Sequence, residues 1–519
     1  MLLIKTKKFL VLTVFSAIFL VTRIPFLGYN EINPDAVNWH FRAEQFIVGL
    51  KSGDFLKTYQ HYHPGVTLMW IMGVPIELNR QINPQHRVYT ESNFLIQHQI
   101  AKYSLVLVQL ALSIGLILAL KDILGFKKSF LAVTLFSFEP WFLGNSRLLH
   151  MDVLLTLFVT LSLTYAYKYY LRRSMVLIVT AGVFSGLAFL TKSVGILSLG
   201  FVLTILVVAT LRNRVGRKRS VLYLGAFLFS SVATIFILFP ALWVNPKFVL
   251  SDILTEGLRI GTRRGHEQVV MGDTVDVAGP SFYPLVLALK TSPLIWLGIG
   301  LFIFTIIKNP RKYQSVDKKF ILYLSIFYLI YLLGMTTASK KIDRYMIPLF
   351  PWLGVLASIG ITQAFTEIRS RYGKVGLQFS LLLVTGIGVL YPLVKLYPYY
   401  FTYTNPLFGS AENANKIIGQ KPFGIGIPEL KSRLVAKYGN GISLGFIDKK
   451  PMSTIYPNSK LFDIRETGTS KYNLIILGPN EEMPKNVTSG KFTFVQDDAM
   501  YINGLEFWRI YIHEPKKVI

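Results

Sequence analysis

The stretch Tyr29–Val66, YNEINPDAVNWHFRAEQFIVGLKSGDFLKTYQHYHPGV, places acids, bases, aromatics and three histidines directly after the first apolar segment. A polar run of this density between apolar segments is costly to bury in lipid, so we expect it at an aqueous face or in a site. Asn33, Pro34 and Asp35 predict a helix start, with Asn33 as N-cap and Pro34 at the first helical position. Asp35 then lies in the first turn, where it either complements the helix dipole or serves a site.

The composition indicates a polytopic membrane protein. Of the 519 residues, 52% are hydrophobic and 14% aromatic, the mean hydropathy is +0.45, and apolar runs of spanning length recur down the chain. The net charge of +27 is explained by the basic bias of membrane loops rather than by nucleic acid. The absence of cysteine from the sequence excludes disulfides, thiolate metal sites and a cysteine nucleophile.

The apolar runs predict about eleven spans. They cover about 9–27, 102–120, 129–143, 153–170, 175–191, 195–211, 220–240, 293–308, 320–336, 345–365 and 376–397. Long polar loops follow the first and seventh spans, at about 28–100 and 241–292. Within the first loop, Val66–Leu78 is too short to span and suits an interfacial or re-entrant helix.

Charge sets the predicted orientation. Lys/Arg clusters occupy the N-terminus and the loops after even-numbered spans, and Arg212–Arg219 alone holds five. The positive-inside rule therefore places the N-terminus in the cytoplasm, and both long loops and the tail outside. We expect a multi-pass protein of the cell (plasma) membrane with an extracytoplasmic C-terminal domain.

Two domains are expected: a transmembrane domain at 1–400, with the two long outer loops as its catalytic loops, and a small α/β domain at 401–519. The strands are predicted at 423–427, 442–447, 472–478, 492–496 and 507–513. A helix is predicted at 428–438, ended by Gly439. Gly424 and Gly426 lack the rest of a nucleotide-binding fingerprint.

Several basic residues break the charge rule, because the predicted topology puts them outside: Arg147, Lys192, Arg263, Arg264, Lys340, Lys341 and Arg344. One such residue is ordinarily a snorkelling anchor. Several on one face favour an anionic ligand, since Arg and Lys are the natural partners of phosphate. An anionic ligand that resides in a membrane is a lipid phosphate.

Two acids in two outer loops accompany these cations. In SRLLHMD, Arg147, His150 and Asp152 lie close together, either as a local ion pair or as part of a site. On one helix, Arg147 and His150 would share a face. Asp35 and Asp152 form a constellation in which an acid deprotonates an acceptor hydroxyl and cations stabilise a departing phosphate.

His61 and His63 are a weak metal candidate. In an extended segment they share a face and, with a carboxylate, match a divalent-metal site. The sequence shows no clear third ligand, and a turn before Pro64–Gly65 is the simpler interpretation. No cofactor is predicted with certainty, and a divalent metal is left open.

The sequence resembles the GT-C glycosyltransferases, specifically the protein O-mannosyltransferase and aminoarabinose-transferase group, family 39. The matching segments are PDAVNWHFRAEQF, SRLLHMD, FYPLVLALKTSP, SKKIDRYMIPLFP and YPYYFTYTNPLFGSAENANK, in this order over about residues 9–415. In the resemblance, Asp35 matches the first-loop acid that acts as base. Arg147 and Asp152 match the second-loop Arg and acid, and Lys340 and Arg344 match basic residues before the RY element. Many relatives have Asp-Glu where this chain has Asp35-Ala36, which weakens the assignment of a protein acceptor.

The resemblance implies an inverting transfer of a sugar from a polyprenyl-phosphate donor to a hydroxyl outside the membrane. The expected partners are the donor, an acceptor protein or glycolipid, and the bilayer. The predicted catalytic residues are Asp35 and Asp152. The predicted substrate-binding residues are Arg147, His150, Lys192, Arg263, Arg264, Lys340 and Arg344. A polysaccharide polymerase or ligase would need the same kinds of residues and stays an alternative. A transporter or flippase is disfavoured because the sequence shows no internal repeats.

Overall fold

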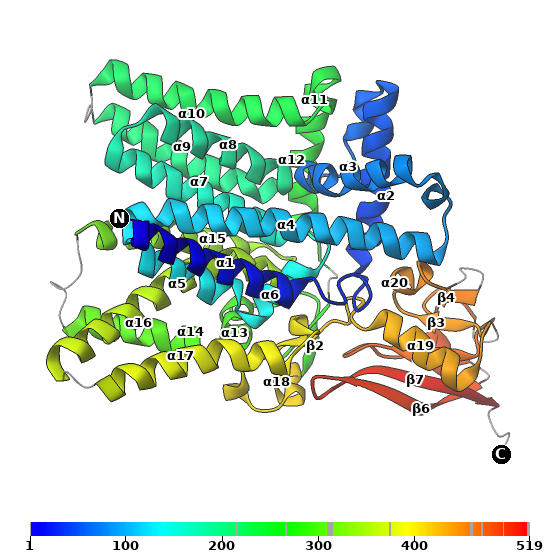
Figure 1. Cartoon of the computed structure of the whole chain (residues 1–519). Helices are drawn as coiled ribbons and strands as arrows, with labels where there is room; N and C mark the ends of the chain where they lie inside the picture. The colour runs from blue at the N-terminus through cyan, green and yellow to red at the C-terminus, as the bar shows by residue number, and fades with distance from the viewer. Residues whose placement is uncertain are drawn as a thin grey trace.

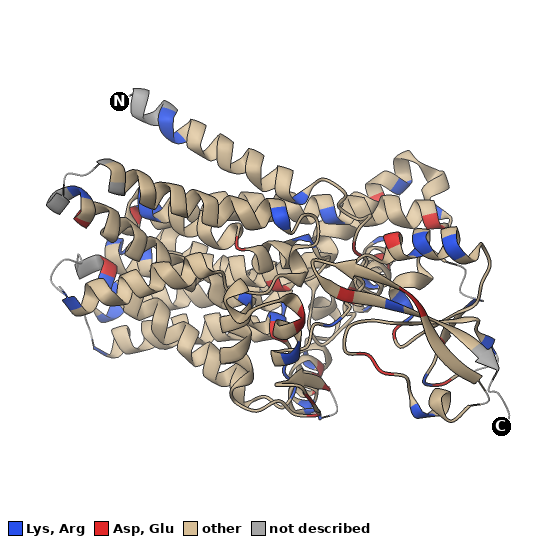
Figure 2. Cartoon of the chain, turned by 90° about the horizontal axis from the view of Figure 1, so that it is seen from below, with Lys and Arg blue, Asp and Glu red and all other residues tan. Residues whose placement is uncertain are grey.

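A computed structural model describes residues 2–212, 216–264, 267–308, 315–372, 375–456, 460–468, 471–490 and 492–515. Long helices run side by side, and a small sheet with its helices covers one end of the bundle, which we call the domain end (Figure 1). The first residues lie at the opposite end of the bundle from the sheet (Figure 1). Charged residues gather toward the two ends, whereas the middle of the helices is largely uncharged (Figure 2).

A helix occupies each place where a span is predicted. The bundle contains α1 (Leu2–Arg23), α4 (Glu91–Leu124), α5 (Phe126–Ser137), α6 (Pro140–Arg147), α7 (Asp152–Arg172), α8 (Met175–Thr191), α9 (Ile196–Leu211), α10 (Arg217–Leu238), α14 (Pro293–Lys308), α15 (Ser315–Thr337), α16 (Phe350–Tyr372) and α17 (Val375–Lys395). Among the described residues, six helices are long and apolar enough to cross a membrane, or up to eight if each of two bent pairs counts as one span. The multi-pass membrane class is confirmed, and the number eleven stays a prediction.

The two long loops fold into short elements at the domain end. The first contains α2 (Pro34–Ser52), η1 (Phe55–Thr58), α3 (Val66–Ile82) and η2 (Pro84–Arg87). The second contains α11 (Ala241–Val244), α12 (Pro246–Thr262), β1 (Gln268–Val270), β2 (Asp273–Val275) and α13 (Phe282–Lys290). Short turns η3 (Ser193–Gly195), η5 (Asp343–Leu349), η6 (Tyr400–Thr402) and η7 (Pro406–Phe408) join the larger helices. The predicted start of α2 is confirmed, with Asn33 as N-cap and Pro34 at its first position.

The chain ends in a five-stranded sheet of order β4-β3-β5-β7-β6. Its elements are α18 (Ala411–Ile417), α19 (Ile427–Tyr438), β3 (Leu444–Phe446), α20 (Lys450–Ser453), β4 (Leu461–Asp463), β5 (Leu474–Leu477), α21 (Lys485–Thr488), β6 (Phe492–Ile502) and β7 (Leu505–Pro515). Strand β3 pairs in parallel with β4 and β5, whereas β7 is antiparallel to β5 and β6. We call α19 to β7 the C-terminal domain. Its predicted α/β class is confirmed.

The prediction of a strand at 423–427 is wrong. Phe423, Gly424 and Gly426 have positive φ angles, and the chain turns there before α19 begins. We call Pro422–Gly426 the docking segment, because it lies against the residues just before α2. The Ile32 amide donates to the Gly424 carbonyl at 3.1 Å, and the Gly426 amide donates to the Asn30 carbonyl at 2.7 Å. A Cβ on Gly424 would lie 1.9 Å from the Ile32 oxygen, so only glycine permits this approach.

Candidate active site

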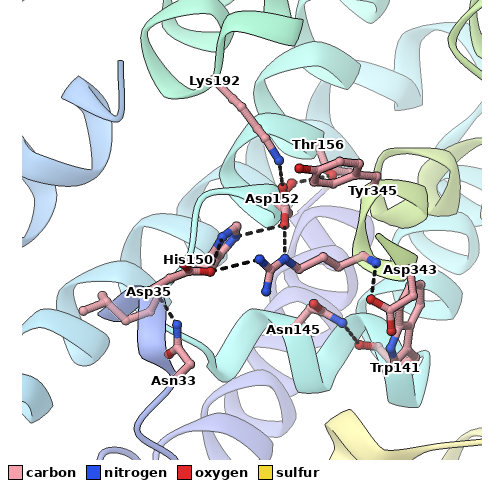
Figure 3. Close-up of polar contacts among 12 residues, drawn as sticks. Asn33, Asp35, Trp141, Asn145, His150, Asp152, Thr156, Lys192, Asp343 and Tyr345 are labelled. Atoms are coloured by element: carbon pink, nitrogen blue, oxygen red, sulfur yellow. Dashed lines mark hydrogen bonds and ion pairs between the residues drawn. The ribbon is translucent and has the colours of Figure 1, made fainter. Parts of the chain in front are cut away.

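Four segments far apart in sequence bring their polar residues together at the domain end (Figure 3). Asp35 comes from the first turn of α2, His150 from the break before α7, and Asp152 from the first turn of α7. Lys192 is the C-cap of α8, and Arg344 lies in η5. We call these five residues the carboxylate cluster. Asp35 and Asp152 both lie at helix N-termini, where the helix dipole stabilises negative charge.

Asp35 is held by two partners. The Arg344 Nη2 lies 2.9 Å from Asp35 Oδ2, and the His150 Nε2 lies 3.3 Å from the same oxygen. Burial alone would raise the pKa of Asp35, but Arg344 and His150 outweigh it and hold that pKa well below its ordinary value. Asp35 is therefore ionised at neutral pH. Its side chain is still 33% exposed, so an acceptor group has access to it.

Asp152 is buried and organises the rest of the cluster. Its Oδ1 accepts a hydrogen bond from the Lys192 ammonium at 2.7 Å. Its Oδ2 lies 2.9 Å from His150 Nδ1 and 3.5 Å from Arg344 Nε. His150 and Arg344 thus bridge the two carboxylates, which would otherwise repel each other. The Lys192 ammonium also lies 4.2 Å from the centre of the Tyr345 ring.

A cavity of about 260 Å³ lies beside the cluster, between η3, α12 and α15. We call it the lateral cavity. Lys192 and Tyr345 belong both to its wall and to the surroundings of the cluster, and Lys340 supplies a second cation. The Lys340 amide bonds to the Gly261 carbonyl at 3.2 Å, which ties this turn to the end of α12. Leu254 and Leu258 of α12, which also line the cavity, have exposed side chains, so the cavity is bordered by lipid-compatible surface.

Burial lowers the pKa of Lys340, and the neighbouring Arg344 and Lys192 lower it further, with Asp35 opposing them. Two of these cations, Lys192 and Lys340, line the cavity, and Arg344 lies close to Lys340. Together they form a region of positive potential, which suits an anion. Arg263 and Arg264 are exposed just beyond the end of α12, outside the lateral cavity. Their predicted contact with a substrate stays a prediction. Lys341 turns away, because its ammonium donates to the Ala338 carbonyl.

Arg147 is not brought into the carboxylate cluster. Its guanidinium is buried and donates to Glu31 Oε1 at 3.1 Å and to the carbonyls of Thr22, Arg23 and Pro25. With these donors occupied, Arg147 braces the end of α1, and its predicted contact with a substrate stays a prediction. Helix α6 ends at Arg147 and the chain bends by 114° to α7, so Arg147 and His150 do not share a helix face.

The histidine pair makes only a partial metal site. The rings of His61 and His63 lie 5.7 Å apart, and His63 Nδ1 is 3.0 Å from the Ser193 hydroxyl. No group of three or more His, Cys, Asp or Glu residues suited to a metal ion occurs within the described parts of the chain. The structure therefore adds no third ligand to the two histidines.

Two contacts at the site were not predicted. Tyr345 covers Lys192, and Phe423 of the docking segment lies over Arg344, with the guanidinium carbon 4.3 Å from the ring centre. Tyr345 is adjacent to Arg344 in sequence, so its place at the site could have been predicted from that neighbour. Phe423 is remote and lies in a segment with strand-like alternation, so the sequence offers no such signal for it.

Comparisons with known proteins agree with this architecture. Residues 67–252 match the family model for dolichyl-phosphate-mannose-protein mannosyltransferases. The fold is similar to that of ArnT from Cupriavidus metallidurans bound to undecaprenyl phosphate, at 16% identity, with 96% of this chain and 97% of that chain covered and a TM-score of 0.50. It is also similar to the oligosaccharyltransferase AglB from Archaeoglobus fulgidus in complex with an inhibitory peptide and a dolichol-phosphate, at 12% identity, 91% and 69% coverage and a TM-score of 0.50. No curated protein matches in sequence. The predicted GT-C fold is confirmed.

Proposed function

We propose that this chain is a membrane glycosyltransferase that transfers a sugar from a polyprenyl-phosphate donor to a hydroxyl group. The observation that carries the proposal is an ionised, partly accessible Asp35 beside a cavity whose wall holds Lys192 and Lys340. The fold shared with ArnT and AglB and the partial family match support the same class. The acceptor is a protein hydroxyl or a hydroxyl of a lipid or glycan.

The donor enters sideways from the bilayer. Its prenyl chain lies along the apolar wall formed by α12 and α15, and its phosphate faces Lys192 and Lys340 of the cavity wall, with Arg344 close to Lys340. Hydrogen bonds between such cations and a phosphate are charge-assisted and therefore strong. Because the wall is partly lipid-exposed, the donor reaches the site without leaving the membrane.

Asp35 acts as general base. It takes the proton of the acceptor hydroxyl while the oxygen attacks the anomeric carbon, and the bond between that carbon and the phosphate oxygen breaks. The electron pair leaves with the phosphate, whose added charge is stabilised by Lys192, Lys340 and Arg344. A single displacement of this kind inverts the anomeric configuration. Asp152 keeps Lys192, His150 and Arg344 in position.

The proposed orientation follows the positive-inside rule. The N-terminus lies in the cytoplasm, and the carboxylate cluster and C-terminal domain lie outside the plasma membrane. The opposite placement of the N-terminus and the sheet supports this arrangement (Figure 1).

The test uses purified full-length protein in lipid nanodiscs with polyprenyl phosphates carrying labelled hexoses or pentoses, and a membrane extract as acceptor. Release of polyprenyl phosphate is measured. We expect turnover of at least one donor by the wild type and a loss of about 10²–10⁴-fold in Asp35→Asn, which keeps the shape but loses the base. No release by the wild type from any donor would overturn the proposal, and turnover by Asp35→Asn within about threefold of wild type would overturn the role of Asp35.

A further inference from the structure

The docking segment, which is distant in sequence, places an aromatic ring beside the carboxylate cluster. The Phe423 ring covers the Arg344 guanidinium at 4.3 Å and stacks on Phe401, with the two ring centres 5.5 Å apart and an interplanar angle of 21°. One face of the Arg344 guanidinium is thereby covered, while its nitrogens contact Asp35 and Asp152. A cation held over an aromatic face is attracted by the ring quadrupole, most strongly where water is excluded.

The position of this ring is fixed from both sides. The docking segment bonds to Asn30 and Ile32, which directly precede α2 and Asp35. On its other side, the Trp508 indole of β7 donates to the Ile425 carbonyl at 2.8 Å. Ile425 is fully buried in a core that also contains Ile32 and Leu148. The C-terminal domain and the segment that leads into α2 therefore share one core, which also includes Leu148, two residues before His150 of the cluster.

The backbone of Phe423 is also unusual. Its φ angle is +44°, a conformation that a bulky side chain rarely adopts. Such conformations persist only where the surroundings impose them, and they gather at functional sites. Here the glycines on both sides of Ile425 supply the turn, and the strained residue itself places its ring on Arg344.

We propose that Phe423 is a positioning residue for Arg344, so that docking of the C-terminal domain through the docking segment completes the active site. Phe423 limits the guanidinium to the geometry in which it contacts Asp35 and Asp152 together. The inference rests on the proposed glycosyltransferase function. Through Phe423 and Arg344, docking of the C-terminal domain then affects how readily Asp35 accepts a proton.

A loosened Arg344 should change the pH dependence of the rate in one direction. Arg344 holds the pKa of Asp35 down, so loosening Arg344 raises the pKa of Asp35. The acidic limb of the rate–pH profile, where the base becomes protonated, then moves to higher pH. A merely structural role of Phe423 would reduce the amount of folded protein without moving this limb.

The experiment compares Phe423→Ala, Phe423→Leu and Phe423→Trp in the full chain, with the donor that the wild type turns over. Phe462→Ala is the matched control, because Phe462 is a half-buried phenylalanine of the C-terminal domain whose ring neighbour is Tyr472, 6.3 Å away. We expect kcat to fall roughly 5–30-fold in the Ala and Leu variants, with little change in donor KM, and largely to recover in Phe423→Trp, which keeps the cation–π contact. The acidic limb should shift upward in the Ala and Leu variants alone.

Each result has a distinct meaning. An active wild type with unchanged kcat and unchanged pH profile in both Phe423→Ala and Phe423→Leu would overturn this inference and leave the proposed function standing. An equal loss in Phe462→Ala, or a loss in Phe423→Leu without any pH shift, would also overturn it, since either result marks a structural role. No donor turnover by the wild type would overturn the proposed function and this inference with it. If Phe423→Ala elutes as aggregate, Phe423→Leu carries the comparison, because it preserves most of the volume.

Discussion

Arg344 has the most demanding geometry of the carboxylate cluster, because one guanidinium contacts both carboxylates. Its Nη2 reaches Asp35 while its Nε lies 3.5 Å from Asp152 Oδ2. We expect Arg344→Lys to retain partial turnover, since it keeps the charge, and Arg344→Ala to lose nearly all, since Asp35 is then left without its main partner. Release of polyprenyl phosphate and circular dichroism of the same samples check this. Near-wild-type rates in both variants would remove Arg344 from the mechanism.

Lys340 is the cavity cation best placed to bind donor phosphate without a competing carboxylate. No acid lies within ion-pair distance of it in the described ranges, whereas Lys192 is engaged by Asp152. We expect Lys340→Gln to weaken binding of polyprenyl phosphate by roughly 10–150-fold, the effect of one charge-assisted hydrogen bond. Arg259→Gln, an exposed α12 cation paired with Glu256, is the control. Equal affinities of the two variants, measured by scintillation proximity, would contradict the assignment.

Among the elements, α12 forms one wall of the lateral cavity, and Gly257 lies in that wall. A Cβ on Gly257 would meet only the Ser193 hydroxyl, at 3.8 Å, so a larger side chain fits by extending into the cavity. We expect Gly257→Leu to raise the donor KM at least about tenfold while the protein stays folded, because the leucine occupies space meant for the prenyl chain. Gly300→Leu, where a Cβ meets nothing within 4 Å, is the matched control. A donor KM unchanged in Gly257→Leu would place the donor elsewhere.

The local chemistry of several elements could be predicted from sequence. Asn33 and Pro34 define the start of α2, and Gly439 ends α19, because capping depends on a few neighbouring residues. Apolar runs give the spans for the same reason. The 114° bend between α6 and α7 leaves no such local signal, since both helices are apolar or buried.

Within the site, chemistry was easier to predict than geometry. The type and number of charges pointed to Asp35, Asp152, Lys192, Lys340 and Arg344. The burial of Arg147 depends on Glu31 and on the carbonyls at the end of α1, which only the folded chain brings together. The turn at Phe423 likewise arises from a distant partner, because the alternating pattern of 423–427 by itself favours a strand.

For the whole molecule, acid should destabilise the folded state from near neutral pH downward. Burial and the cations Arg80 and Lys102 lower the pKa of His40 to about 3, and burial and Arg42 lower that of His61 to about 4. Between about pH 6.5 and 4 the unfolded chain binds protons at these residues and the folded chain does not, so stability falls as pH falls. The depressed pKa of Asp35 adds a loss in the same direction only below about pH 4.

Thermal unfolding in detergent at pH 7.5, 6.5, 5.5 and 4.5 checks this expectation. Tm should fall progressively below pH 6.5, and His61→Gln, which cannot be protonated, should show a shallower fall than the wild type. A Tm independent of pH over this range, or identical slopes in both proteins, would contradict the lowered pKa values of these histidines.

The topology of the whole chain is testable by labelling. Single cysteines introduced at Arg217, Asp276 and Lys449 meet no background, because the sequence contains none. We expect a membrane-impermeant thiol reagent to label the latter two in intact cells and Arg217 only after lysis. Labelling of Arg217→Cys in intact cells would reverse the proposed orientation.

The contact between residues 30–32 and the docking segment also sets the stage of synthesis at which the proposed active site is complete. The two partners are far apart in the 519-residue chain, and the hydrogen bond from Trp508 that supports Ile425 comes later still. Contacts of such sequence separation form late and slowly. A chain still on the ribosome therefore holds the base and the cations but not the ring that sets Arg344. On the proposal made for Phe423, such a chain would turn over donor as slowly as Phe423→Ala, and the full rate would be reached only when the last strand has joined the sheet.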